Sequence, residues 1–151
     1  MDQAQTYTTR CMWQHEHDHT LVVDCSDPRF VRARNEFLTE CCRIHFYDSL
    51  FVPGGPVTST LANAFCYVDQ ERIRMLHGLH NFKRVIGIVH FDCGYYKHCH
   101  RGAKHSDLYD HQIADVRNFK DTMATLAPRA EVEMYHVGPN PDNLIEYIRI
   151  L

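Results

Sequence analysis

Along the chain, apolar runs typical of strands alternate with apolar spacing typical of helices. Short runs at 21–24 and 84–89 are almost continuously apolar, which is typical of strands buried on both faces of a sheet. Looser alternation of apolar and polar residues at 45–52 and 131–137 predicts two further strands. The hydrophobic pattern therefore predicts about four strands.

Between these runs, apolar residues recur every three or four positions, as they do along one face of a helix. The helices predicted from this spacing cover 30–44, 69–79 and 107–126. Thr58 or Ser59 is expected to cap another helix, which would run through Leu61, Ala62, Phe65 and Cys66.

Three segments lack a clear period. Residues 1–20 are polar and are expected to form a flexible or arm-like leader. Residues 95–106 are basic and rich in histidine, which predicts a loop over the edge of the sheet. Residues 143–151 form a short apolar tail, interpreted as a helix or a segment that faces a partner.

Strands that alternate with helices indicate an α/β fold with a mainly parallel central sheet flanked by helices. A chain of 151 residues is long enough for one sizeable core, so residues 21–151 are expected to form a single domain.

The composition excludes few functions, but the net charge limits the kinds of binding partner that are expected. The apolar share of 44% and the charged share of 23% are ordinary for a globular protein. A net charge of −3 favours neither nucleic acid nor an acidic membrane surface as a partner. The seven cysteines are scattered, and the chain starts without the features of a secretory signal, so a cytoplasmic location with reduced thiols is expected.

Two polar motifs follow the two most apolar runs directly. Cys25-Ser26-Asp27-Pro28-Arg29 follows the first run, and His90-Phe91-Asp92-Cys93-Gly94 follows the second. The carboxyl ends of adjacent parallel strands lie at one edge of a sheet, where open α/β sheets bind ligands.

Two thiolates and one imidazole are donors that Zn²⁺ prefers, and a catalytic zinc site leaves one position open for water. Cys25, His90 and Cys93 are therefore candidate ligands. Asp27 and Arg29 can form an ion pair that keeps the carboxylate ionised and directs it at that water. The alternative is structural: two buried thiols, Asp27 as a helix cap, and His90 with its hydrogen bonds satisfied in the core.

In order and strand context, the two motifs resemble the zinc motifs of the β-class carbonic anhydrases. The resemblance covers 21–94, and the chain looks most like the short carbonic-anhydrase-like proteins with a Val-Pro-Gly-Gly turn, here at 52–55. It implies zinc on Cys25, His90 and Cys93, with Asp27 either as a fourth ligand or paired with Arg29 to orient a water. It also implies a homodimer or larger assembly with the active site at a subunit interface.

Three features depart from the family pattern. A Pro-Gly-Gly-Pro stretch at 53–56 replaces the usual Arg-Asn pair, no Gln-x-Pro precedes the first strand, and Asp24 stands where a glycine is usual.

The activity implied is the reversible hydration of carbon dioxide to bicarbonate by a zinc-bound hydroxide, with carbon dioxide in an apolar pocket near Val52 and Phe91. Asp92 is a candidate to hydrogen-bond a ligand, and His98 and His100 are candidates to carry the proton away. One alternative is a hydrolase of carbonyl sulfide or carbon disulfide on the same site. Another is a non-catalytic, zinc-stabilised binding or regulatory protein.

Two other groups carry metal-binding residue types. His15, His17 and His19 share one face of an extended segment and can bind a transition metal, but a solvated terminus is the preferred interpretation, because nothing nearby in the sequence fixes their geometry. Cys99 between His98 and His100 is a weaker candidate, because three neighbouring residues rarely reach tetrahedral geometry.

Overall fold

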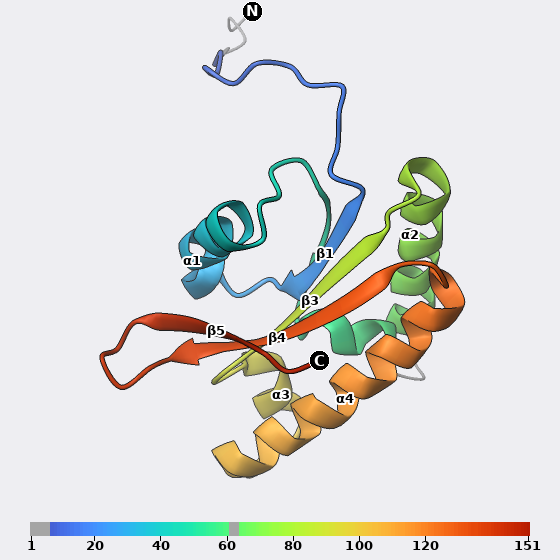
Figure 1. Cartoon of the computed structure of the whole chain (residues 1–151). Helices are drawn as coiled ribbons and strands as arrows, with labels where there is room; N and C mark the ends of the chain where they lie inside the picture. The colour runs from blue at the N-terminus through green and yellow to red at the C-terminus, as the bar shows by residue number, and fades with distance from the viewer. Residues whose placement is uncertain (1–6, 61–63) are drawn as a thin grey trace, which may run out of the picture.

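The computed structural model describes residues 7–60 and 64–151, and a five-stranded sheet organises them (Figure 1). The strand order is β2-β1-β3-β4-β5. Four strands are parallel, and the last is antiparallel to its neighbour β4. The strands are β1 (Thr20–Cys25), β2 (Asp48–Val52), β3 (Arg84–His90), β4 (Glu131–Pro139) and β5 (Ile145–Arg149). The predicted α/β class and mainly parallel sheet are confirmed.

Helices cover both faces of the sheet. The α-helices are α1 (Val31–Glu36), α2 (Ala64–His80), α3 (Gly94–Cys99) and α4 (His105–Leu126). Shorter helical segments are the 3₁₀ turns η1 (Pro28–Phe30) and η3 (Gly55–Ser59) and the π-helical turn η2 (Phe37–Cys41). Figure 1 shows α1 on one side of the sheet and α2 and α4 on the other.

The core is divided by the sheet because neighbouring residues of a strand point to opposite faces. On one face, Leu21 and Val23 of β1 belong to a buried cluster with Ile73 of α2 and Phe119 of α4. On the other face, Val22 belongs to a second cluster with residues of η1, η2, β3 and β4: Phe30, Phe37, Leu38, Ile86, Ile88 and Tyr135 are among them.

Several predicted elements differ from the structure. Residues 30–44 do not form one helix, since η1, α1 and η2 follow each other and the helical segment ends at Cys41. Residues 69–79 belong to the single helix α2. Thr58 and Ser59, the predicted caps, lie in η3, and their hydroxyls donate to the carbonyls of Gly55 and Pro56. Leu61 and Ala62 lie outside the described residues.

Two segments without a clear period have regular structure. The expected loop at 95–106 contains α3 and the start of α4, and the six-residue α3 buries only Tyr96, so it has no apolar stripe. The tail at 143–151 is neither a helix nor a free segment, because it contains β5, which raises the strand count to five. Mostly exposed residues in β5 explain its weak signal.

The described part of the leader, residues 7–19, has no helix or strand, and residues 7–16 are exposed and extend away from the sheet (Figure 1). Its end is fixed, because the Asp18 carboxylate accepts hydrogen bonds from the backbone N–H groups of His45 and Phe46 at 2.6 and 2.7 Å. Among the described helices, none has the length and apolar character needed to cross a bilayer.

Candidate metal centre

The two motifs meet where the strand order reverses direction. From β1, the chain adds β2 on one side and β3 on the other, so the connections that leave β1 and β3 diverge at their carboxyl ends. Open α/β sheets bind ligands at such a switch point. Cys25 is the last residue of β1, His90 is the last residue of β3, and Cys93 directly precedes α3.

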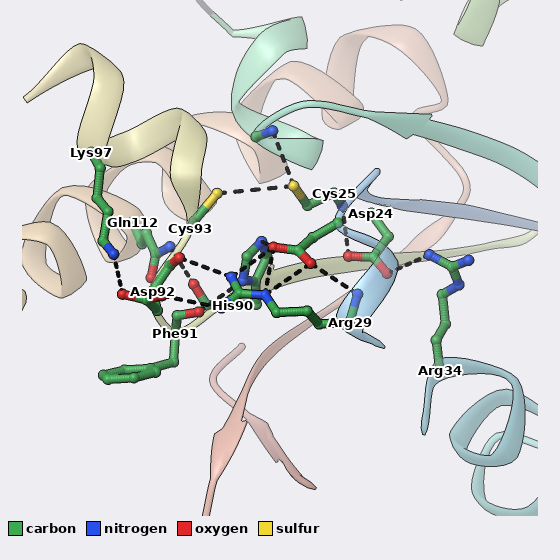
Figure 2. A network of polar contacts seen from close by, with 12 residues as sticks. Asp24, Cys25, Arg29, Arg34, His90, Phe91, Asp92, Cys93, Lys97 and Gln112 are labelled. Carbon is green, nitrogen blue, oxygen red and sulfur yellow. Dashed lines mark hydrogen bonds and ion pairs between the residues drawn. The ribbon is translucent and has the colours of Figure 1, made fainter. Parts of the chain in front are cut away.

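The side chains of Cys25, His90 and Cys93 converge. The two Sγ atoms lie 3.9 Å apart, and the three ligand atoms all lie within 4.8 Å of one another. Two sulfurs bound tetrahedrally at 2.3 Å from one zinc ion would be about 3.8 Å apart. Figure 2 shows the two thiol groups pointing toward each other. All three residues are buried, so the donor set is shielded from bulk water.

The tautomer of His90 leaves a lone pair directed into this group. Its Nδ1 lies 2.8 Å from the carbonyl oxygen of Phe91, and since a carbonyl only accepts, Nδ1 carries the proton. Nε2 is therefore the basic nitrogen, and it is buried without a hydrogen-bond partner among residues 7–60 and 64–151. The structural alternative required a satisfied core histidine, so the unpartnered Nε2 favours a metal ligand.

Neighbouring residues hold the His90 ring and backbone in place. The Phe30 ring packs against the imidazole with the ring centroids 4.7 Å apart. From α4, the buried amide of Gln112 donates to the carbonyl of His90 at 2.8 Å. Both contacts connect elements that are distant in sequence, and neither was predicted.

The thiols of Cys25 and Cys93 differ in acidity: Cys25 loses its proton more readily, and Cys93 keeps its proton. The hydrogen bond from Cys93 lowers the pKa of Cys25 to about 4, against the opposing effect of burial, and the N–H of Gly54 assists. The same hydrogen bond, together with burial, raises the pKa of Cys93. One thiolate is thus present at neutral pH, and these donors suit zinc, which binds thiolate sulfur and imidazole nitrogen.

Asp27 and Arg29 form a bidentate ion pair beside the three ligands. The Nε of Arg29 donates to both carboxylate oxygens at 3.0 and 3.1 Å, and its Nη2 donates to Oδ2 at 2.7 Å. These bonds lower the pKa of Asp27 to about 2. Asp27 Oδ2 lies 3.9 Å from Nε2 of His90, so an ionised carboxylate faces the candidate ligands. Asp27 also caps η1 through the Arg29 N–H.

Asp92 binds the outer side of this ion pair. Its Oδ2 accepts from Nη1 of Arg29 at 3.1 Å, and its other oxygen pairs with Lys97. Lys97 and Arg29 lower the pKa of Asp92. Asp92 thus contacts Arg29 and Lys97, where the sequence suggested a hydrogen bond to a ligand. The backbone of Asp92 also adopts the left-handed conformation, with a φ of 59°.

The Pro-Gly-Gly-Pro loop forms one wall of the site, which the sequence reasoning missed. Gly54, with a φ of 85°, donates its N–H to Cys25 Sγ at 3.3 Å. Gly55, with a φ of 59°, packs so closely on β1 that an added Cβ would lie 2.8 Å from the nitrogen of Cys25. Two adjacent glycines directly after a strand are a usable signal for such a close approach.

Asp24 and Arg34 form a buried ion pair behind Cys25, also missed. Arg34 Nη1 lies 3.1 Å from Asp24 Oδ2, and the guanidinium stacks 3.9 Å from the centre of the Phe51 ring. Asp24 Oδ1 accepts the N–H of Cys25 at 2.6 Å, which fixes the backbone that carries the ligand. Burial raises the pKa of Asp24 to about 6 although Arg34 opposes this. An aspartate within an otherwise apolar strand was the sequence feature that could have indicated a buried ion pair.

The remaining candidates lie on α3 and beyond it. His98 is exposed on α3, and His100 stacks on His111 of α4 with the ring centroids 3.9 Å apart. Phe91, expected beside substrate, is 42% exposed and stacks on His105.

An apolar cavity of ≈ 390 Å³ lies on the β2 side of Cys25 and is lined by Val52, one of the two residues expected beside the substrate. Pro53, Phe65, Val68, Arg72 and Tyr95 also line it. The Tyr95 ring lies so close to Gly54 that it would obstruct a side chain there, so the cavity adjoins the loop that contacts Cys25.

Comparison with known proteins gives a likeness in structure but none in sequence. No protein-family model matches the chain, and no curated protein does. Among solved structures, the chain is similar to β-carbonic anhydrase isoform I from the protozoan Trichomonas vaginalis, with a TM-score of 0.56 and 15% sequence identity. The match covers 97% of this chain and 88% of that chain. The chain therefore has the fold of a β-carbonic anhydrase, as the resemblance of the two motifs implied.

Proposed function

We propose that this protein is a zinc enzyme that catalyses the reversible hydration of carbon dioxide to bicarbonate. The observation that carries the proposal is the unpartnered Nε2 of His90, which is buried within 4.8 Å of the two sulfurs of Cys25 and Cys93. The fold shared with a β-carbonic anhydrase supports the same activity.

Cys25, His90 and Cys93 would hold the metal, and Asp27 lies beside this donor set, with its Oδ2 3.9 Å from Nε2 of His90. When bound, zinc supplies a Lewis acid that lowers the pKa of a coordinated water to about 7, a value taken from carbonic anhydrase chemistry in general. Gly54 and Asp24 support the Cys25 ligand from opposite sides, through its sulfur and its backbone N–H.

Asp27 orients the reacting water by accepting a hydrogen bond from it. The carboxylate is available for this because Arg29 lowers the pKa of Asp27 to about 2, which keeps it ionised at neutral pH. For the same reason Asp27 does not store the proton that the reaction releases. Another group must carry the proton to solvent, and His98 and His100 remain our candidates.

The apolar cavity beside Gly54 suits a small, linear, uncharged substrate. Carbon dioxide meets this description, and so do carbonyl sulfide and carbon disulfide, which remain an alternative on the same site. Arg72 at the cavity wall donates to the carboxylate of Asp69 at 3.1 Å, and Asp69 lines the same cavity, so the charges of this wall do not distinguish among these substrates.

A non-catalytic zinc protein, with Asp27 as a permanent fourth ligand, is the second alternative. The bidentate pairing with Arg29 argues against it, because both carboxylate oxygens accept hydrogen bonds from that guanidinium. Ligation by Asp27 would require part of this pair to break.

We further propose a homodimer that covers the outer face of α2. Phe65, Val68, Met75 and Leu79 are 72%, 47%, 58% and 67% exposed, and their spacing places them along one side of the helix. Phe65 and Val68 also line the apolar cavity, so a second copy on this face would close it. A cytoplasmic location remains part of the proposal.

Zinc content and stopped-flow carbon dioxide hydration of untagged protein test the proposed activity. Cys93→Ser should lose zinc from this site and lose turnover, whereas Cys99→Ser, a matched exposed cysteine on α3, should retain both. A zinc-loaded wild type without turnover at any pH would favour the non-catalytic alternative. Hydrolysis of carbon disulfide without hydration of carbon dioxide would favour the other alternative.

A further inference from the structure

Three imidazoles gather at the amino ends of the strands, on the opposite edge of the sheet from Cys25. Two come from the end of the leader, His17 and His19, and the third is His80 at the end of α2. The His17 ring lies 4.3 Å from the His19 ring and 4.8 Å from the His80 ring, measured between centroids. Asp48, the first residue of β2, lies beside His80.

The hydrogen bonds of two of these rings fix their tautomers. His80 Nδ1 lies 2.8 and 2.9 Å from the carboxylate oxygens of Asp48, to which it donates. His19 Nδ1 lies 2.8 Å from the carbonyl oxygen of His80, which can only accept. In its neutral form, each ring therefore keeps its lone pair on Nε2. An imidazole whose other nitrogen donates to a carboxylate or a backbone carbonyl is the usual form of a histidine metal ligand.

The backbone holds these rings on an ordered part of the chain. His19 has a φ of 47°, a conformation uncommon for a residue other than glycine, and its carbonyl accepts the N–H of Lys83 at 2.7 Å. The Asp18 carboxylate accepts hydrogen bonds from the backbone N–H groups of His45 and Phe46 in the adjacent loop. The leader thus crosses the end of α2 at a defined position.

We propose that His17, His19 and His80 form a second metal site, which binds a late divalent transition metal such as Zn²⁺, Ni²⁺ or Cu²⁺. Three neutral imidazoles are a ligand set for these ions, and Asp48 would orient His80. At least one of the three rings must turn to complete the site, because within 7–60 and 64–151 only Cys25, His90 and Cys93 have their ligand atoms within 4.8 Å of one another. His17 is only partly buried, which permits this movement.

A metal at this site would connect the leader to α2 and β2. It would stabilise the folded chain by an amount that rises with the logarithm of the free metal concentration above the dissociation constant, since the unfolded chain does not hold the three rings together. The site is independent of the proposed enzyme activity, because it shares no residue with the Cys25 centre.

Calorimetric titration of Ni²⁺ into untagged protein that carries one equivalent of Zn²⁺ tests the proposal, because the thiolates of the Cys25 centre take up that zinc first and leave the histidine site free. We expect one saturable Ni²⁺ per chain. Asp48→Asn should weaken binding by about 10–100-fold, and His17→Gln, His19→Gln and His80→Gln should weaken it by at least as much. His15→Gln is the matched control, since that ring contacts Trp13 rather than this group, and it should leave the affinity unchanged.

Copper provides a second readout that does not depend on affinity. The electron paramagnetic resonance spectrum of bound Cu²⁺ should show coupling to nitrogen, and this coupling should weaken in His17→Gln. This variant suits the test because His17 is partly exposed and its side chain makes no hydrogen bond within the described residues. Unchanged circular dichroism and zinc content would show that the variants remain folded. Equal weakening by His15→Gln and His80→Gln, or Ni²⁺ binding that none of the cluster variants changes, would overturn the site and indicate adventitious binding to surface histidines.

Discussion

The Sγ atoms of Cys25 and Cys93 lie 3.9 Å apart although 68 positions separate the residues in the chain. The separation depends on β1 and β3 being adjacent and parallel, because each cysteine follows or ends one of these strands. The sheet therefore assembles the donor set, and a metal bound there adds its binding free energy to the stability of the fold.

Asp27→Asn should retain zinc and lose activity. The three candidate ligands are unchanged, but an amide cannot form the bidentate ionic pair with Arg29, and its NH₂ group cannot accept a hydrogen bond from water. We expect kcat to fall on the order of 10²-fold from misorientation alone. Asp92→Asn should have a smaller effect, since Arg29 keeps its contacts to Asp27.

Zinc analysis and stopped-flow kinetics on the same protein samples give both quantities. If Asp27→Asn hydrates carbon dioxide at the wild-type rate, Asp27 has no role in orienting the water. If instead the variant loses its zinc, the carboxylate is a ligand and our interpretation of its pairing with Arg29 is wrong.

The Asp27–Arg29 pair should stabilise the protein in a pH-dependent way. Because Arg29 lowers the pKa of Asp27 from its usual value near 3.8 to about 2, the folded state binds fewer protons than the unfolded state between these values. The contribution of the pair is therefore fully present above about pH 4 and is lost as the pH falls toward 2. Urea unfolding of EDTA-treated wild type and Asp27→Asn should give free energies of unfolding that converge over this range.

Asp142→Asn is the control for this comparison, since Asp142 is exposed in the turn that connects β4 and β5. It should not reproduce the convergence. A constant difference between wild type and Asp27→Asn from pH 5 to pH 2 would show that the pair does not depend on the charge of Asp27.

Gly55→Ala should destabilise the protein through its contact with β1 as well as through its backbone. Gly102 has a similarly positive φ of 83°, but an added Cβ there would meet no neighbouring atom within 4 Å, so Gly102→Ala should cost only about 1–2 kcal/mol for the left-handed conformation. Gly55→Ala adds a clash with the Cys25 backbone, which should cost a further ~1–3 kcal/mol. Urea unfolding measures both, and equal losses would contradict the close packing of this loop on Cys25.

The predictable parts of the molecule were those with a strong local pattern. The strands β1 and β3 are buried on both faces, so their apolar runs were clear, and the apolar stripe of α4 has the period of a helix. Cys25 and His90 end these two strands, which is why their convergence could be inferred from the order of the motifs.

The parts that could not be predicted depend on contacts between distant segments. β5 is mostly exposed and is specified by pairing with β4, and α3 is too short to show a period. The hydrogen bonds from Gly54 to Cys25 and from Gln112 to His90 join residues 29 and 22 positions apart, and no local pattern records such pairs.

X-ray absorption spectroscopy at the zinc edge tests the central claim most directly. The sample is untagged His80→Gln protein with less than one equivalent of Zn²⁺, so that the histidine cluster does not contribute. We predict two sulfur scatterers at about 2.3 Å and nitrogen or oxygen at about 2.0–2.2 Å, with one sulfur lost in Cys93→Ser. A first shell of nitrogen and oxygen only would contradict a zinc site built from Cys25, His90 and Cys93.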